Sequence, residues 1–167
     1  MIYPTVGDVI RRCGEAMDNV VIPGLTALKD RSSATTIRHL LNLAADRIDV
    51  EGQLFFDEIT RLRGLLVETA AHFDARPERN SEIEAWLNET EATLGRQRDP
   101  NIYPSLTMLA EEVNHLRGFV SQALAIVKRE PDNGDAIRQK IREYISWQIG
   151  QEAKLIEPAF QGRGPRR

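Results

Sequence analysis

The feature that most constrains the fold is a stretch of sequence that occurs twice, 54 residues apart. Residues 57–66 read DEITRLRGLL and residues 111–120 read EEVNHLRGFV, and the match continues without gaps from Pro77 and Pro131 to Glu89 and Glu143. A fixed offset of this kind is typical of a duplicated supersecondary unit. Here the unit is the end of one helix, a turn with a proline, and a second helix. The repeat indicates an internal helix-hairpin duplication, with chance similarity between helical segments as the alternative.

Helical periodicity continues along the chain, and no run of alternating apolar and polar residues predicts a strand. Thr5 with Asp8, and Ser81 with Glu84, have the spacing of capping boxes, in which each side chain satisfies a free amide at a helix start. We therefore predict an all-α fold, an antiparallel bundle of four main helices plus one short helix. The expected helices span residues 5–22, 33–75, 81–95, 105–129 and 135–156.

Composition fits one globular domain over residues 1–160. The chain has 167 residues, of which 41% are hydrophobic and 28% charged, and the net charge is −3. Because acidic and basic residues are mixed throughout, we expect no nucleic-acid partner. Residues 161–167 are basic and lack apolar side chains. They are predicted to form a disordered tail.

The single cysteine and the N-terminal sequence bear on location. Cys13 cannot form an intramolecular disulfide, and it shares a helical face with Val9, Ile10 and Met17, so we expect it in the core. No signal peptide is recognisable at the N-terminus. No stretch approaches the ~18 apolar residues of a membrane span. These observations favour a cytoplasmic protein with no membrane partner.

The long helix expected over residues 33–75 creates a geometric problem. At 1.5 Å per residue, its roughly 40 residues extend over about 60 Å, more than any neighbouring helix can cover. An uncovered half that exposed Phe55, Phe56, Ile59 and Leu62 would need a partner. Because two-fold dimers are the commonest oligomers, we predict a homodimer formed through this helix.

Four charged residues lie on or beside apolar helical stripes. Glu51 lies within the stripe of the long helix and Glu58 at its edge, while Arg117 lies within the apolar face of the helix at 105–129. Glu112 is on that same helix. Buried charges are tolerable when they are paired and hydrogen-bonded. The favoured interpretation is a structural polar seam that sets the helix register. The alternative is a pocket in which these residues hold a small anionic or amphipathic ligand.

A metal site has weaker support. Glu112 and His115 have the Glu-x-x-His spacing of di-iron bundles, but Arg61 stands where the repeat would place a second histidine. The three histidines, His39, His72 and His115, have no paired spacing either. We therefore predict no cofactor and leave Glu112 and His115 as weak metal candidates.

The sequence as a whole favours a non-enzymatic protein. We expect a cytoplasmic helical bundle that acts as a homodimeric interaction or scaffold module and leave open a further protein partner. No phosphate loop or nucleophile elbow is recognisable in the sequence. The first alternative is a bundle that binds an apolar or acyl-like small molecule. The second is a metal-dependent, ferritin-like bundle enzyme.

Overall fold

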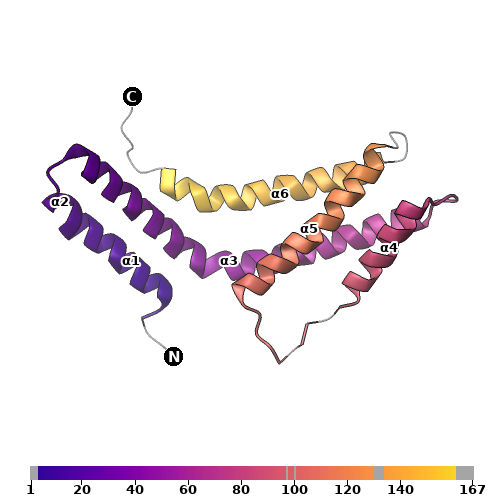
Figure 1. The fold of residues 1–167 in the computed structure, drawn as a ribbon, viewed down its shortest axis with the longest axis horizontal. Helices are drawn as coiled ribbons and strands as arrows, with labels where there is room; N and C mark the ends of the chain where they lie inside the picture. Colours follow the sequence, from indigo (N-terminus) through magenta and orange to yellow (C-terminus); the bar gives the residue numbers. More distant parts are fainter. Residues whose placement is uncertain (1–3, 97, 100, 130–133, 161–167) are drawn as a thin grey trace. The chain divides into compact units, whose positions relative to one another are not determined.

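Every secondary-structure element in the described part of the chain is helical, which confirms the all-α class (Figure 1). The computed structural model describes residues 4–96, 98–99, 101–129 and 134–160, with side chains as far as residue 154. The elements are α1 (Val6–Ala16), the π-helical segment η1 (Met17–Val21), α2 (Ile22–Gly24), α3 (Leu28–Asp74), α4 (Ser81–Leu94), α5 (Leu106–Lys128) and α6 (Asp135–Phe160).

The chain divides into two compact units. Unit 1 comprises the described residues of Met1–Gly52 and Gly150–Arg167, and unit 2 is formed by Gln53–Ile149. The boundaries fall inside α3 and α6, so both helices contribute residues to both units. The predicted single domain over residues 1–160 stays a prediction, and the predicted tail at 161–167 lies outside the described residues.

Helix starts follow local capping chemistry, with two corrections. Thr5 and Asp8 form the predicted capping box at α1, and Ser105 caps α5 by accepting from the Met108 amide at 3.2 Å. The α4 cap is Asn80 rather than Ser81, because Asn80 Oδ1 accepts from the Ile83 amide at 2.9 Å. α3 begins at Leu28, ahead of the predicted start, and extends over 47 residues.

Unit 2 has a contiguous apolar core built by four helices. Its centre is fully enclosed, and Trp86 anchors it by donating its indole N–H to the Phe119 carbonyl at 3.1 Å and packing edge-on against Phe73. Burial of this much apolar surface is the main stabilising contribution to such a unit. The core side chains are Ile59, Leu62, Leu65, Leu66 and Phe73 of α3, Ile83 and Trp86 of α4, Leu109, Val113, Leu116, Phe119, Val120, Ala123, Ile126 and Val127 of α5, and Ile137, Ile141 and Tyr144 of α6.

The part of α3 that was expected to be exposed is instead covered. Ile59 and Leu62 are buried, and Phe55 and Phe56 pack against the unit 2 core. The exposed apolar side chains of α3 lie mainly in its N-terminal half, where Leu28, Ile37, Leu40, Ile48 and Val50 all reach solvent. The exposed apolar surface of α3 therefore lies mainly in unit 1 and not at residues 55–62.

Small residues lie where the helices of unit 1 come close together. A Cβ at Gly14 would lie 2.7 Å from Asn42 Oδ1, so this glycine permits a close approach of α1 to α3. Gly64, Gly118 and Gly150 differ, since a Cβ at each would meet no atom within 4 Å. Because α1 turns its glycine face toward α3, Cys13 on another face is exposed, which corrects its predicted burial.

None of the helices in the described part of the chain combines the length and apolar content needed to cross a lipid bilayer. The long α3 carries charged residues throughout, including Arg47, Glu51, Arg61 and Arg63.

Candidate functional site

The structure brings Glu58 and Arg117 together in unit 2. Glu58 on α3 is 6% exposed, and its Oε1 lies 2.8 Å from Nε and 2.6 Å from Nη2 of Arg117 on α5. Tyr144 on α6 also donates its hydroxyl to Glu58 Oε1, and Arg117 Nε lies 3.2 Å from that hydroxyl. One carboxylate oxygen thus links three helices. We call Glu58, Arg117 and Tyr144 the tyrosine cluster.

The environment of the tyrosine cluster shifts the pKa values of two of its members. Burial raises the pKa of Tyr144, and its hydrogen bond to Glu58 raises that pKa further. Burial acts to lower the pKa of Arg117, but hydrogen bonds with Tyr144 and Glu58 outweigh this effect and raise it. The neutral phenol and the charged guanidinium are therefore the stable forms beside the carboxylate.

Glu112 forms a second cluster with two arginines. Its Oε1 accepts from Arg63 Nη2 at 3.1 Å, and its Oε2 accepts from Arg98 Nη2 at 2.7 Å and Nε at 2.8 Å. Arg63 also donates to the carbonyl of Leu94 at 3.1 Å, at the C-terminus of α4. The guanidinium of Arg98 lies over the Phe56 ring. We call Glu112, Arg63 and Arg98 the arginine cluster, and it fixes the end of α4 to α3 and α5.

The two clusters are related by the sequence repeat. Glu112 lies 54 residues after Glu58, and Arg117 lies 54 residues after Arg63. Each glutamate pairs with the arginine of the other matching segment, Glu58 with Arg117 and Glu112 with Arg63. Helix boundaries follow the same offset, since α3 ends at Asp74 and α5 at Lys128, while α4 begins at Ser81 and α6 at Asp135. Local helical periodicity alone does not explain why each glutamate pairs with the arginine of the other segment.

Glu51 does not join these clusters. It lies in unit 1, half-buried, with Oε1 2.7 Å from Nε of Arg47 one turn earlier on α3. The four predicted seam residues therefore divide into Glu58 with Arg117, Glu112 with its arginines, and Glu51 with Arg47. An i, i+4 pair of this kind contributes little beyond local helix stability.

The geometry gives little support to metal binding. His115 is exposed and packs edge-on against Phe119, and both oxygens of Glu112 accept from arginines. Within the described residues, no group of three or more His, Cys, Asp or Glu side chains is arranged to hold a metal ion.

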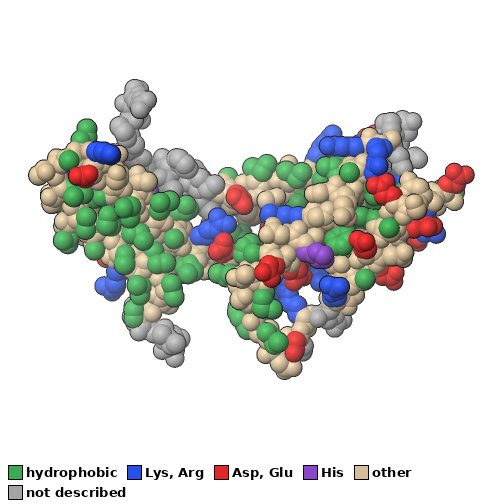
Figure 2. All heavy atoms as spheres, viewed as in Figure 1, with side chains coloured by type: hydrophobic (Ala, Val, Ile, Leu, Met, Phe, Trp, Pro, Cys, Tyr) green, Lys and Arg blue, Asp and Glu red, His purple; other side chains and the backbone are tan. Residues whose placement is uncertain are grey.

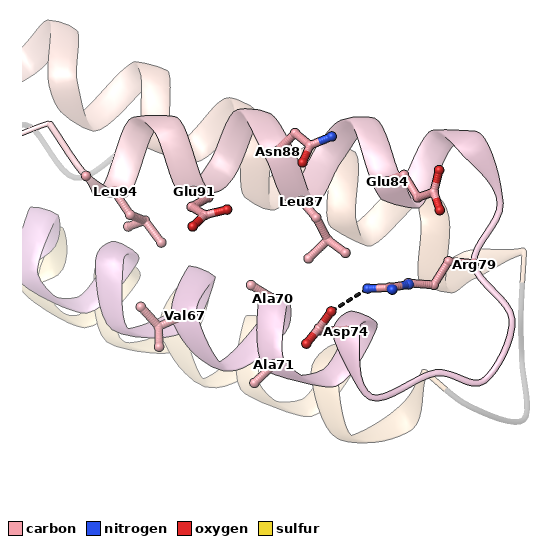
Figure 3. Close-up of a pocket in the computed structure, with 11 residues that line it drawn as sticks. Val67, Ala70, Ala71, Asp74, Arg79, Glu84, Leu87, Asn88, Glu91 and Leu94 are labelled. Carbon is pink, nitrogen blue, oxygen red and sulfur yellow. Dashed lines mark hydrogen bonds and ion pairs between the residues drawn. The ribbon is translucent and has the colours of Figure 1, made fainter.

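An open groove lies between α3 and α4 (Figure 3). It has a volume of about 710 Å³, within the range of ligand sites in proteins. Its lining is mixed, and Leu87, Leu94 and Glu91 of α4 face Ala70 and Asp74 of α3 across the gap. The lining residues are Val67, Ala70, Ala71, Asp74, Arg79, Glu84, Leu87, Asn88, Glu91, Leu94 and Gly95.

This groove was not predicted, although the sequence of α4 contains a pattern related to it. Leu87 and Leu94 are seven residues apart on α4, as are Glu84 and Glu91. Heptad spacing of an apolar pair beside a charged pair is typical of a helix that packs along another helix. Tyr144, Arg63 and Arg98 were also missed, and the repeat could have identified Arg63 as the counterpart of Arg117.

Comparison with known proteins identifies no relative, since no protein-family model, no curated protein and no solved structure matches this chain. The function is therefore inferred from the geometry of the chain itself.

Proposed function

We propose that this protein is a non-enzymatic homodimeric interaction module, with an N-terminal hairpin that pairs two copies and a helical unit 2 that serves as a rigid platform. The observation that carries this proposal is an apolar face on the hairpin formed by α1, η1 and the N-terminal half of α3. Figure 2 shows hydrophobic side chains gathered over these elements. We call this surface the hairpin face. It contains Val6, Val9, Ile10, Cys13, Met17 and Val20 from α1 and η1, and Ile37, Leu40, Leu41, Ala44 and Ile48 from α3.

The helical wheel explains how one face comes to be apolar. On α1, the residues that contact α3 include Gly7, Arg11 and Gly14. Because each helical residue advances by about 100°, the apolar stripe of α1 lies about 100° around the helix axis from these contact residues. On α3, the stripe around Leu40 and Ile48 is rotated by a similar angle from the residues that contact α1.

The order of contacts between α1 and α3 supports an antiparallel hairpin. Arg11 pairs with Asp49, Gly14 approaches Asn42, and Asp18 of η1 pairs with Arg38. Residue numbers thus rise on one helix as they fall on the other. On each helix, the apolar stripe is displaced around the helix axis, in the same rotational sense as seen from that helix's own N-terminus, from the residues that contact the other helix. In an antiparallel pair, two stripes displaced in this way lie on the same side of the pair. The two apolar stripes therefore combine into one surface.

The hairpin buries too little to be stable on its own. The buried residues in the described part of unit 1 are Gly7, Gly14, Ala34 and Ala45, none of which has a large side chain. A pair of helices must bury an apolar face against another layer, and a second hairpin completes a four-helix bundle. A face made by one antiparallel pair can pack against its own copy by a two-fold rotation.

The size of the hairpin face is compatible with a dimer. Its exposed aliphatic side chains are 36–70% exposed. Full burial of one aliphatic side chain removes about 60–120 Å² from water. The apolar area now exposed is therefore about 200–400 Å² in total for six side chains of the hairpin face, Val6, Val9, Val20, Ile37, Leu40 and Ile48. Interface cores are about two-thirds apolar, so a dimer covers about 600–1,200 Å² in total. A specific interface needs about 1,000 Å², so we expect a dimer that dissociates on dilution.

Two finer features belong to the same proposal. The 54-residue offset of helix ends and the reciprocal ion pairs support an internal duplication of a helical hairpin in unit 2. The duplicated hairpins would form the antiparallel bundle, and a cytoplasmic location suits the exposed, unpaired Cys13.

Sedimentation velocity over a dilution series tests the dimer. We expect wild-type protein to shift from dimer to monomer on dilution, and Leu40→Glu to stay monomeric because it places a charge in the hairpin face. Val67→Glu is the matched control, since Val67 is an equally exposed aliphatic residue of α3 outside that face. Circular dichroism checks that both variants remain helical. A monomeric wild-type protein, or an unaffected Leu40→Glu dimer, would contradict the proposal.

The alternative is a ligand-binding bundle, and the groove between α3 and α4 is the observation that favours it. An apolar or acyl-like ligand suits an enclosed, mostly apolar cavity, whereas this groove is open and carries Asp74, Glu84 and Glu91. Native mass spectrometry of untagged protein distinguishes the two roles. A retained organic molecule in stoichiometric amount would favour the alternative, and a clean dimer mass would favour the interaction module.

A further inference from the structure

We propose that the groove between α3 and α4 is a docking site for a basic amphipathic helix of a partner protein. The inference goes beyond dimer formation, because the groove lies in unit 2 and shares no residue with the hairpin face. We call this surface the α3–α4 groove.

The aliphatic side chains that line the α3–α4 groove are spaced so that a further helix can pack against them. Leu87 and Leu94 project from one side of α4, one heptad apart, and are half-buried (Figure 3). Opposite them, α3 presents Ala70 and Ala71 with the exposed Val67, so small side chains leave room between the two ridges. Ridges with this spacing accept the side chains of a third helix in the manner of knobs in holes.

The acidic side chains that line the α3–α4 groove indicate the chemistry of the partner. Asp74 is paired with Arg79, whereas the side-chain carboxylates of Glu84 and Glu91 make no hydrogen bond or ion pair to any described residue. Some other acids of unit 2 are paired with bases, among them Glu68 with Lys140 and Glu82 with Arg129. The two unpaired carboxylates repeat at the same heptad interval as the two leucines. Lys or Arg residues at that interval on a docked helix would meet both.

A helix fits the α3–α4 groove better than other occupants. α4 has 14 residues, which corresponds to a ridge of about 21 Å, longer than a typical small-molecule site. An extended peptide gains affinity by adding to a sheet edge, but both walls here are helices whose backbone groups bond internally. The occupant is therefore a helix of about 14 residues with aliphatic residues on one face and basic residues beside them.

Fluorescence anisotropy with designed peptides tests this site. The probe is a labelled 15-residue helix with Leu at heptad positions and Lys at the flanking positions. The comparison peptide keeps each Leu and replaces each Lys with Glu. Both are titrated with wild-type protein, with Glu84→Gln/Glu91→Gln, and with Glu89→Gln/Glu111→Gln. The last variant is the matched control, because Glu89 and Glu111 are exposed and lie outside the groove.

We expect the Lys peptide to bind wild-type protein and the control with a micromolar dissociation constant. Glu84→Gln/Glu91→Gln should weaken binding about 3- to 10-fold, and the effect should shrink at high salt. Ala71→Glu, which blocks the groove, should remove binding while leaving the helical content unchanged. The dimer-deficient Leu40→Glu should bind as well as wild type, so a failed dimer and a failed groove give different results.

Several outcomes would overturn the proposal. One is the absence of binding, and another is equal binding of the Glu peptide. Equal effects of the groove variant and its control would place the peptide elsewhere. Full competition by an unlabelled peptide of residues 161–167 would assign the groove to this chain's own basic tail, and a retained small cation in native mass spectra would assign it to a ligand.

Discussion

Arg117 Nη2 of α5 lies 2.6 Å from Oε1 of Glu58 on α3, and the two residues are 59 positions apart in the sequence. The carboxylate is buried, whereas the guanidinium is about one-third exposed. Because Tyr144 donates to the same oxygen, loss of Arg117 leaves a buried anion with a single neutral partner. The tyrosine cluster therefore depends on this pair more than the arginine cluster depends on either of its arginines.

Replacing Arg117 by Met tests that dependence. We expect Arg117→Met to lower the free energy of unfolding by about 2–3 kcal/mol, because a buried charge that loses its partner is strongly destabilising. Arg63→Met, its repeat counterpart, should cost only about 1 kcal/mol, since Glu112 keeps Arg98. Urea unfolding followed by circular dichroism measures both. Equal losses for the two variants would show that the clusters are energetically equivalent.

A buried threonine gives a prediction of the opposite sign. Thr90 is fully buried, and its hydroxyl has no hydrogen-bond partner among the described residues. Thr90→Val should raise the free energy of unfolding by about 1 kcal/mol, because it removes an unsatisfied polar group at constant volume.

Thr69→Val is the matched control for that substitution. Thr69 is also buried in unit 2, but its hydroxyl donates to the Leu65 carbonyl at 2.7 Å. This change should lower the free energy of unfolding or leave it unchanged. Thermal unfolding of both variants separates the cases, and stabilisation by Thr69→Val instead of Thr90→Val would contradict the prediction.

The local part of the fold could be predicted from sequence, whereas the faces that pack could not. Thr5 and Ser105 mark helix starts because capping depends on residues three positions away. Cys13 was misplaced because α1 is amphipathic, and amphipathicity predicts which face is apolar without saying what covers it. In this chain the glycine face of α1 meets α3, which periodicity alone does not reveal.

The same distinction applies to the polar residues. Glu58 and Arg117 were identifiable because each lies on or beside an apolar stripe. Arg98 and Tyr144 come from other elements and reach their partners with long side chains. Their roles depend on how helices distant in sequence cross, so the tyrosine and arginine clusters became visible only in the folded structure.

The raised pKa of Tyr144 predicts how stability depends on pH. Its proton is held more tightly in the folded state than in the unfolded state, where the pKa is near the ordinary tyrosine value of 10.0. The contribution is therefore fully present below about pH 10 and is lost as pH rises toward the folded pKa. Unfolding of wild type and Tyr144→Phe should differ most near pH 8 and converge above pH 10. A stability gap that stays constant to pH 11.5 would contradict this linkage.

Two glycines at equivalent positions of the repeat offer a final test. Gly64 and Gly118 lie within helices, and a Cβ at either would meet nothing within 4 Å. Gly64→Ala and Gly118→Ala should each raise the free energy of unfolding by about 0.5–1 kcal/mol, since alanine restricts the unfolded chain.

Gly134→Ala is the contrast, because its Cβ would lie 2.8 Å from Val127 Cβ and 3.0 Å from the Val127 carbonyl oxygen. That variant should be destabilised by about 1–3 kcal/mol. Chemical denaturation at low and high protein concentration measures all three, and destabilisation of Gly64→Ala at high concentration alone would place a second copy against that part of α3 instead of the hairpin face.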